Sequence, residues 1–368
     1  MITYNNHEVI FLRTGYADLP LHGGQCPRWL FERMVKLGRS VLLIIAQEEG
    51  TKSILSKLSD PYWFQALGCL LGFDWHSSGL TTTVCGALKE GLRGCERELG
   101  LFIAGGKGKT SRKTPQDIIN YADKYSLSIN PDKLVYASKM SAKVDNTAVQ
   151  DGYQLYHHTF IFTSKGDWAV IQQGMNPSNK RARRYHWLGS RVEDFVNEPH
   201  NAICCDQREK QILNLVDRKS DDSRQTITSL SCAKPGEITK EYKKLILPSR
   251  HSLYKKDIQP KNLERILLKT YEQQPANFEA VLSISGIGPK TMRALSLISE
   301  LAYGVRPSYD DPAKFSFAHG GKDGYPYPVN KKVYDQSISI LEQAIKEAKL
   351  GREEKLKAFK RLHYLAGK

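Results

Sequence analysis

Apolar residues recur at helical spacing along the first hundred residues. The stretch 28–47 carries such a stripe and predicts a helix, and similar spacing predicts helices at 49–57, 60–71 and 79–97. Asp60-Pro61 combines an N-cap residue with a proline at the first helical position, which marks a helix start. A further helix is expected at 116–125, after Thr114-Pro115.

Residues 105–115 form a glycine-rich basic segment between these helices. Its Gly108-Lys109-Thr110 is similar to the end of a P-loop, but Ile103 stands where a P-loop requires glycine. Nucleoside triphosphate binding is therefore excluded here. Two interpretations stay open: Lys107 and Lys109 contact a DNA phosphate, or the loop is simply solvated.

The pattern changes to β-branched and aromatic residues after residue 131. Residues 155–163 and 168–172 predict two strands joined by a turn at 164–167, within a small antiparallel sheet over 134–189. His157 and His158 are neighbours on a strand, so they are expected to point to opposite faces.

Basic and aromatic residues alternate at the end of this predicted sheet, in Lys180-Arg-Ala-Arg-Arg-Tyr-His-Trp187. This composition suits phosphate contacts combined with stacking on bases or sugars. The run therefore makes Arg183, Arg184 and Tyr185 candidate DNA-binding residues, with a solvated sheet edge as the alternative.

Helical patterns dominate again towards the end of the chain. A helix to about 216 and an exposed connection come first, followed by helices at 237–246, 260–273, 276–283, 289–302, 330–348 and 351–366. The predicted fold is α+β and multidomain: a mainly helical domain at 1–130, a small β-rich module at 131–205 and a helical domain with a helix-hairpin-helix at 206–368.

Charge adds the first indication of a partner. The chain has 368 residues and a formal net charge of +15, which favours a polyanion such as nucleic acid. It has no apolar run near the length of a membrane span and no signal-peptide pattern at Met1, so we expect a cytoplasmic protein with no membrane partner. The seven cysteines have no zinc or iron–sulfur spacing and are expected to be reduced. The oligomeric state is not predicted.

The segment Leu282-Ser-Ile-Ser-Gly-Ile-Gly-Pro-Lys290 fits the helix-hairpin-helix template, apolar-x-Gly-apolar-Gly-x-Lys. Its glycines allow a tight turn and close approach to a ligand, and the next helix's first N–H groups form an anion site. The candidate DNA-binding residues here are Gly286, Ile287, Gly288, Lys290 and Thr291.

This hairpin resembles that of endonuclease III-like DNA glycosylases, in which the lysine at this place attacks C1′ of the damaged nucleotide's sugar. The resemblance implies that Lys290 is the nucleophile, or else a simple phosphate contact. It also implies a helper aspartate that caps a later helix, for which Asp311 before Pro312 is the better candidate and Asp310 the other.

The chain as a whole resembles a family of archaeal and bacterial proteins of unknown function, DUF763. The resemblance is carried by Arg13-Thr-Gly-Tyr-Ala-Asp-Leu-Pro-Leu-His-Gly-Gly24 with Arg28-Trp-Leu-Phe-Glu-Arg33, and by Asp311-Pro-Ala-Lys-Phe-Ser-Phe-Ala-His-Gly-Gly-Lys-Asp-Gly324. It implies no activity. His319 and Lys322 in the second segment are candidates for lining the DNA site, and Asp18 with His22 in the first form a polar turn.

Three functions follow from these patterns. The first is a DNA repair enzyme, a damaged-base glycosylase with AP lyase activity, acting on double-stranded DNA with a lesion through Lys290 and Asp311 and needing no cofactor. The second is a Mg²⁺-dependent endonuclease, with Asp145, Asp151, Gln172 and Glu193 as candidate site residues. The third is a DNA-binding protein without catalysis. The first reading predicts no metal site.

Overall fold

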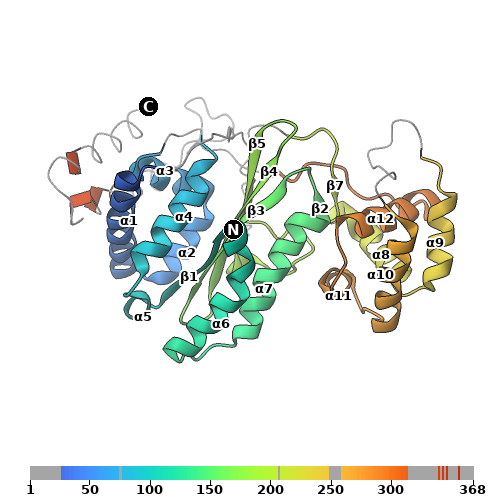
Figure 1. The fold of residues 1–368 in the computed structure, drawn as a ribbon, viewed down its shortest axis with the longest axis horizontal. Helices are drawn as coiled ribbons and strands as arrows, with labels where there is room; N and C mark the ends of the chain where they lie inside the picture. Colours follow the sequence, from blue (N-terminus) through green and yellow to red (C-terminus); the bar gives the residue numbers. More distant parts are fainter. Residues whose placement is uncertain are drawn as a thin grey trace, which may run out of the picture.

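The computed structural model describes residues 26–73, 77–205, 208–247 and 258–313, together with seven residues between 339 and 356. Its centre is a five-stranded antiparallel sheet in the order β1-β3-β4-β5-β6. In Figure 1 the first helices lie on one side of this sheet and a helical domain lies on the other. The class is therefore α+β, as predicted. Among the described residues, no helix is long and apolar enough to cross a membrane.

The amino-terminal helices confirm the apolar periodicity. They are α1 (Arg28–Glu49), α2 (Thr51–Ser59), α3 (Pro61–Leu71), α4 (Gly79–Leu92) and the short α5 (Glu96–Leu99). The carboxylate of Asp60 accepts hydrogen bonds from the backbone N–H groups of Tyr62 and Trp63 at 2.9 and 3.1 Å. This cap starts α3 where the sequence predicted.

The sheet is larger than the sequence indicated. Its strands are β1 (Leu101–Lys107), β3 (Gln154–Thr163), β4 (Trp168–Asn176), β5 (Arg181–Leu188) and β6 (Ala202–Cys204). The predicted hairpin at 164–167 is confirmed, because Thr163 and Asp167 bond across it. Strand β1 was missed because a short apolar run has no decisive periodicity, so the sheet starts before the boundary expected at residue 130.

Three short elements and two helices fill the segment between β1 and β3. They are η1 (Gly108–Lys113), α6 (Thr114–Tyr125), α7 (Pro131–Lys143), the π-helical turn η2 (Val144–Ala148) and β2 (Val149–Gln150). The prediction of sheet from residue 134 was thus wrong. Asn130 caps α7 by accepting from Asp132 and Lys133 N–H at 3.0 and 3.3 Å, which starts a helix there.

The helical domain follows the sheet, with η3 (Gly189–Arg191) between β5 and β6. Its elements are β7 (Leu213–Asn214), η4 (Arg218–Ser220), α8 (Asp221–Ser231), α9 (Pro235–Lys244), α10 (Pro260–Gln273), α11 (Phe278–Ser283) and α12 (Pro289–Tyr303). The helix expected to residue 216 is absent, since β7 pairs with β2 instead. The predicted helices beyond residue 330 lie almost wholly outside the described residues.

The two faces of the sheet belong to two different cores. One face, with Phe160 and Val170, packs against α6, α7 and the helical domain, while the other, with Ile161 and Ile171, packs against the amino-terminal helices. Alternate residues of each strand therefore serve separate cores, which leaves the central strands buried on both sides.

Polar residues at one end of the sheet follow the same alternation. In the strand register, His157 on β3 pairs with Gln173 on β4, and His158 pairs with Gln172. Each face of the sheet therefore carries one His–Gln pair. The predicted opposite orientation of the two histidines is confirmed. His158 bonds Gln172 and Ser138 at 2.9 Å each, whereas His157 bonds Thr159 at 2.9 Å.

These buried histidines predict a loss of stability in mild acid. Burial, followed by the neighbouring His158 and Lys107, lowers the pKa of His157 from 6.5 to about 3, and burial also lowers the pKa values of His158 and His186. Below pH 6.5 the unfolded chain takes up protons that the folded chain does not, so stability falls as pH falls towards 3.

The measurement is urea unfolding between about pH 5 and 6.5, above the range in which ordinary carboxylates titrate. We expect the free energy of unfolding to rise with pH there, by up to about 1.4 kcal/mol per pH unit for each such histidine. In the variant His157→Gln, the slope of the free energy of unfolding against pH should be smaller by the contribution of one proton. An unchanged slope would contradict this account of His157.

Candidate nucleic-acid interface

The segment in which the sequence predicted a helix-hairpin-helix consists of α11, a tight turn and α12, and is called the α11–α12 hairpin below. Helix α11 (Phe278–Ser283) is capped by the preceding Asn277, whose side chain accepts from Ala280 N–H at 2.8 Å. Gly286 in the turn has φ of 98°, a left-handed conformation that favours glycine. Gly288 is the N-cap of α12, Pro289 stands at its first position, and no side chain of the described residues caps this end of the helix.

The inner side of the hairpin is fastened to the segment before β3. The ammonium group of Lys143 donates to the carbonyl of Ile287, and Gln150 Nε2 donates to the carbonyl of Pro289 at 2.9 Å. Arg293 in α12 donates to Gln150 Oε1 at 3.2 Å. Burial lowers the pKa of Lys143. These bonds fix the turn as a rigid element.

Within the described part of the chain, the glycines on the outer side of the hairpin have open space beside them. Among the described residues, a Cβ atom built on Gly288 would meet nothing within 4 Å, and one on Gly286 would meet only Ile266 at 4.0 Å. Lys290 is exposed, whereas the side chains of Ile287 and Thr291 are buried. The latter two can therefore reach a ligand only through their backbone.

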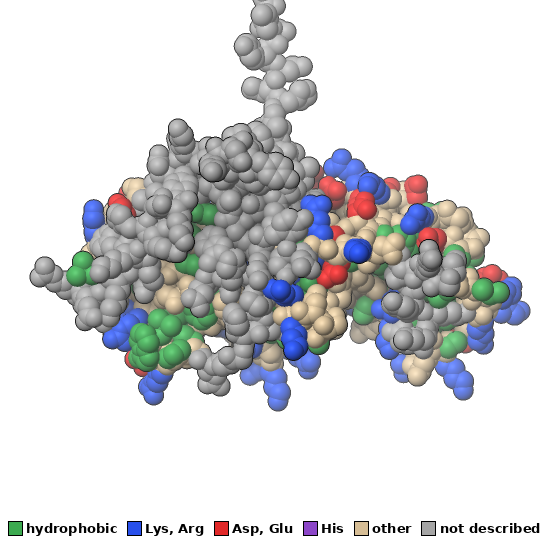
Figure 2. All heavy atoms as spheres, turned by 90° about the horizontal axis from the view of Figure 1, so that it is seen from above, with side chains coloured by type: hydrophobic (Ala, Val, Ile, Leu, Met, Phe, Trp, Pro, Cys, Tyr) green, Lys and Arg blue, Asp and Glu red, His purple; other side chains and the backbone are tan. Residues whose placement is uncertain are grey.

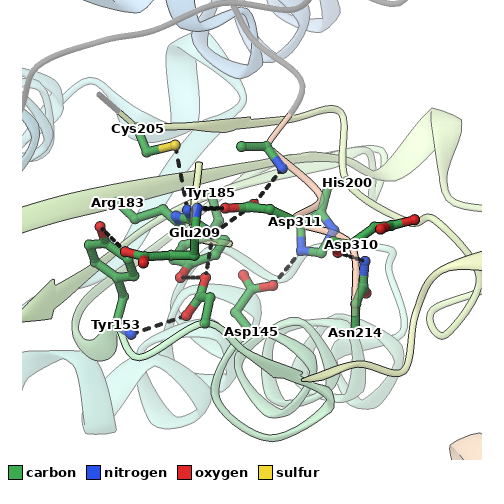
Figure 3. A network of polar contacts seen from close by, with 12 residues as sticks. Asp145, Tyr153, Arg183, Tyr185, His200, Cys205, Glu209, Asn214, Asp310 and Asp311 are labelled. Atoms are coloured by element: carbon green, nitrogen blue, oxygen red, sulfur yellow. Dashed lines mark hydrogen bonds and ion pairs between the residues drawn. The ribbon is translucent and has the colours of Figure 1, made fainter. Parts of the chain in front are cut away.

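Asp311, the predicted helper of Lys290, lies in a different environment, which Figure 3 shows. Its side chain is 1% exposed, and the two nitrogens of the buried Arg183 guanidinium donate to its oxygens at 3.0 and 2.7 Å. The same oxygens accept the backbone N–H groups of Glu209 at 2.6 Å and Ala313 at 2.9 Å. Both carboxylate oxygens are thus used within the protein.

Arg183 joins this aspartate to a second one. Its guanidinium also donates to Asp151 at 3.0 Å and lies 4.7 Å from the ring centre of Tyr153. Asp151 in turn accepts the hydroxyl of Tyr185 at 2.7 Å. The sequence singled out Arg183 and Asp311 separately, and the structure brings them together as a buried ion pair.

The hypothesised Lys290–Asp311 pair is not formed in the described part of the chain. Asp310 has a different partner as well: it bonds the exposed Lys219 at 2.7 Å. Residues 311–313 form no helix, although the bond from Ala313 N–H to Asp311 is that of a capping turn.

The prediction of an exposed basic strand at 180–187 was wrong for its three candidate residues. Arg183, Arg184 and Tyr185 are 0% exposed, because β5 is an interior strand with a core on each face. Arg184 points to the face opposite Arg183, where it donates to Gln65 at 2.5 Å and lies 4.8 Å from the ring centre of Phe64. These side chains therefore cannot contact DNA at the surface of the protein.

The other predicted DNA contacts are partly placed. Lys107 and Lys109 are exposed at the end of β1 and in η1, which is an ordered 3₁₀ turn, so their contact with a phosphate stays a prediction. The candidate DNA contacts His319 and Lys322 lie outside the described residues, and so do Asp18 and His22 of the polar turn.

A second carboxylate centre escaped the sequence patterns. Asp145 in η2 is buried and accepts from Gln172 Nε2 at 2.5 Å, from Trp187 Nε1 at 2.9 Å and from His200 Nε2. The sequence proposed Asp145 and Gln172 as metal-site residues, but it gave no signal for His200, a lone histidine in a polar loop. Among the described residues, no group of three or more His, Cys, Asp or Glu side chains is arranged to hold a metal ion.

Comparison with known proteins matches residues 15–329 to the family of proteins of unknown function DUF763. The chain belongs to the DUF763 family. No curated protein and no solved structure matches it. For this DUF763 protein, inferences about function therefore depend on the geometry of the hairpin and of the two buried carboxylate centres.

Removing Asp311 is expected to destabilise this DUF763 protein strongly. The variant Asp311→Ala leaves Arg183 buried beside a single aspartate, and breaking a buried ion pair in this way costs about 3–5 kcal/mol. The neighbouring variant Asp310→Ala is the control, because its pair with Lys219 is exposed and contributes about 0–1 kcal/mol. Urea unfolding of both variants measures the difference, and equal losses would contradict the assigned role of Arg183.

Proposed function

We propose that this protein binds the sugar–phosphate backbone of double-stranded DNA through the α11–α12 hairpin. The observation that carries the proposal is the contrast between the two sides of the turn. Its inner side is fixed by Lys143 and Gln150, while its outer side offers open glycine backbone and the exposed Lys290. A rigid turn with an accessible backbone binds an anion at little cost in conformational entropy.

Three features supply the attraction for a phosphate. The first-turn N–H groups of a helix have no acceptor inside the helix, and no side chain among the described residues caps this end of α12. The helix dipole adds partial positive charge at the same end. Lys290 brings a full charge, and the formal net charge of +15 favours association with a polyanion over a longer range.

The role of Lys290 itself is proposed to be a phosphate contact. In the lyase reading, a carboxylate would have to assist the amine, but the carboxylate proposed for it is bonded to Arg183, Glu209 and Ala313. Excision of a damaged base by Lys290 therefore stays a second proposal, supported by the position of the lysine in the hairpin alone.

The Mg²⁺-dependent nuclease is the third proposal, and it has less support in the described residues. The oxygens of Asp145 bond Gln172, Trp187 and His200, and those of Asp151 bond Arg183, Tyr185 and Tyr153 N–H. Glu193, the remaining carboxylate of that set, is exposed. Inhibition by EDTA of DNA cleavage by the protein would favour the nuclease reading over the lyase reading.

The DNA-binding proposal predicts that Lys290→Ala weakens binding to duplex DNA of any sequence. Loss of one phosphate contact should also reduce the slope of log K against log salt concentration by about 1. Fluorescence anisotropy with a labelled duplex between about 50 and 200 mM salt gives both quantities. The control is Lys240→Ala on α9, another exposed lysine of the helical domain, which should lower the affinity and the slope less. Equal effects of the two variants would show that Lys290 contributes no more to DNA binding than another exposed lysine.

Borohydride trapping separates the phosphate-contact role from the lyase role. In a lyase the lysine amine condenses with C1′ of an abasic sugar, releases water and forms an imine, which borohydride reduces to a stable amine link. We expect no covalent adduct between the wild-type protein and abasic duplex DNA. An adduct that disappears in Lys290→Ala while binding persists would instead establish the lysine as a nucleophile.

A further inference from the structure

A small pocket lies where the segment Ser308–Ala313 of the helical domain meets β6 and β7. Its volume is about 90 Å³, and it is lined by Glu198, His200, Ala202, Ile203, Asn214, Val216, Asp217, Asp311 and Pro312. Among these described lining residues none is a lysine or arginine, although the chain carries a formal net charge of +15. The lining itself thus carries carboxylates and no cationic side chain, while Arg183 and Arg218 pair with Asp311 and Glu198 from outside it.

His200 is the polar group that points to a ligand. Its side chain is 5% exposed, its Nε2 atom bonds the carboxylate of Asp145, and its ring lies 4.5 Å from that of Trp187. A carboxylate beside Nε2 keeps the proton of the neutral imidazole on that nitrogen. The lone pair of Nδ1 is then free to accept, and within the described part of the chain Nδ1 has no hydrogen-bond partner.

Acceptors outnumber donors in the rest of the lining. Three carboxylates belong to it, those of Glu198, Asp217 and Asp311, of which Asp311 pairs with Arg183 and Glu198 with Arg218. One of the two N–H groups of the Asn214 amide is used, because it donates to the carbonyl of Asp310 at 3.1 Å. A complementary ligand therefore donates hydrogen bonds and carries positive charge.

The size of the pocket and the groups that line it favour an organic cation over a metal ion. About 90 Å³ corresponds to about three water molecules, which suits a single ammonium or guanidinium group. Asp311 already accepts four N–H groups, and the described residues include no cluster of three or more His, Cys, Asp or Glu side chains able to hold a metal. Hydrogen bonds from a charged N–H group require only acceptors that face the cavity.

We propose that this pocket binds the alkylammonium or alkylguanidinium group of a small organic cation, with Nδ1 of His200 as one acceptor. Asp145 acts as a positioning residue, because it fixes the ring and its tautomer without facing the cation. The site is separate from the α11–α12 hairpin and does not depend on DNA binding.

The test is NMR of the full-length protein with isotope-labelled histidine, titrated with methylguanidinium and with methylammonium. The signal of His200 is assigned by its absence in His200→Gln. We expect a saturable shift of this signal with at least one of the two cations. Tetramethylammonium, which has the same charge but no N–H donor, should leave the signal unchanged.

Substitutions at the rim keep the test independent of folding. Glu198→Gln retains the size of a partly exposed side chain and should weaken binding about tenfold, the loss typical of one charge-assisted hydrogen bond. Glu264→Gln, on the exposed side of α10, should change nothing. Titration with agmatine and with N-acetyl-arginine amide then distinguishes a free polyamine-like ligand from an arginine side chain.

Four results would overturn the proposal. The first is no shift of His200 with either cation, and the second is an equal shift with tetramethylammonium. The third is a shift with Mg²⁺ or Zn²⁺ alone, which would assign the pocket to a metal ion. The fourth is an unchanged affinity in Glu198→Gln, which would show that the charge of the lining carboxylate plays no part in binding.

Discussion

The buried guanidinium of Arg183 is the interaction on which the arrangement of the two halves depends. It lies in the sheet and is bonded to Asp151 from the same module and to Asp311 from the end of the helical domain. A fully buried charge is very costly without partners, so both carboxylates contribute to the stability of the fold. The ion pair therefore fixes where the segment after α12 must lie.

The fixed segment creates the environment of the other sites. With Asp311 held against the sheet, Pro312 and Asp311 close one side of the pocket that His200 faces. The segment before β3 performs a similar task for the hairpin, because Lys143 and Gln150 hold its inner side. The segment around η2 thus contributes to both sites, because Lys143 and Gln150 beside it hold the hairpin and Asp145 within it bonds His200 of the pocket.

Charge is distributed between the interior and the surface in an unexpected way. Arg183 and Arg184 of β5 are buried, one on each face of the sheet. A pocket lined by carboxylates lies within a strongly basic chain. The positive charge available to a polyanion is therefore that of exposed lysines such as Lys290, Lys107 and Lys109. Composition alone gives the sign of the total charge, whereas burial decides which groups contribute to the surface potential.

Local signals in the sequence determined the amino-terminal helices, the β3–β4 hairpin and the glycine turn between α11 and α12. Asp60-Pro61 starts a helix, and Gly286 adopts its positive φ, for reasons that act within a few residues. The alternation of strand side chains was equally local, so the opposite orientation of His157 and His158 followed from the sequence.

Only the tertiary structure decided which strand lies in the interior of the sheet. It also decided which carboxylate pairs with which arginine or histidine. The basic run at 180–187 has the composition of a surface strand, yet neighbours on both sides and a core on each face bury it. Asp311 meets Arg183 across 128 positions of the chain, and His200 meets Asp145 across 55. Such pairs are set by how the elements pack, and no pattern confined to a short stretch of sequence contains that information.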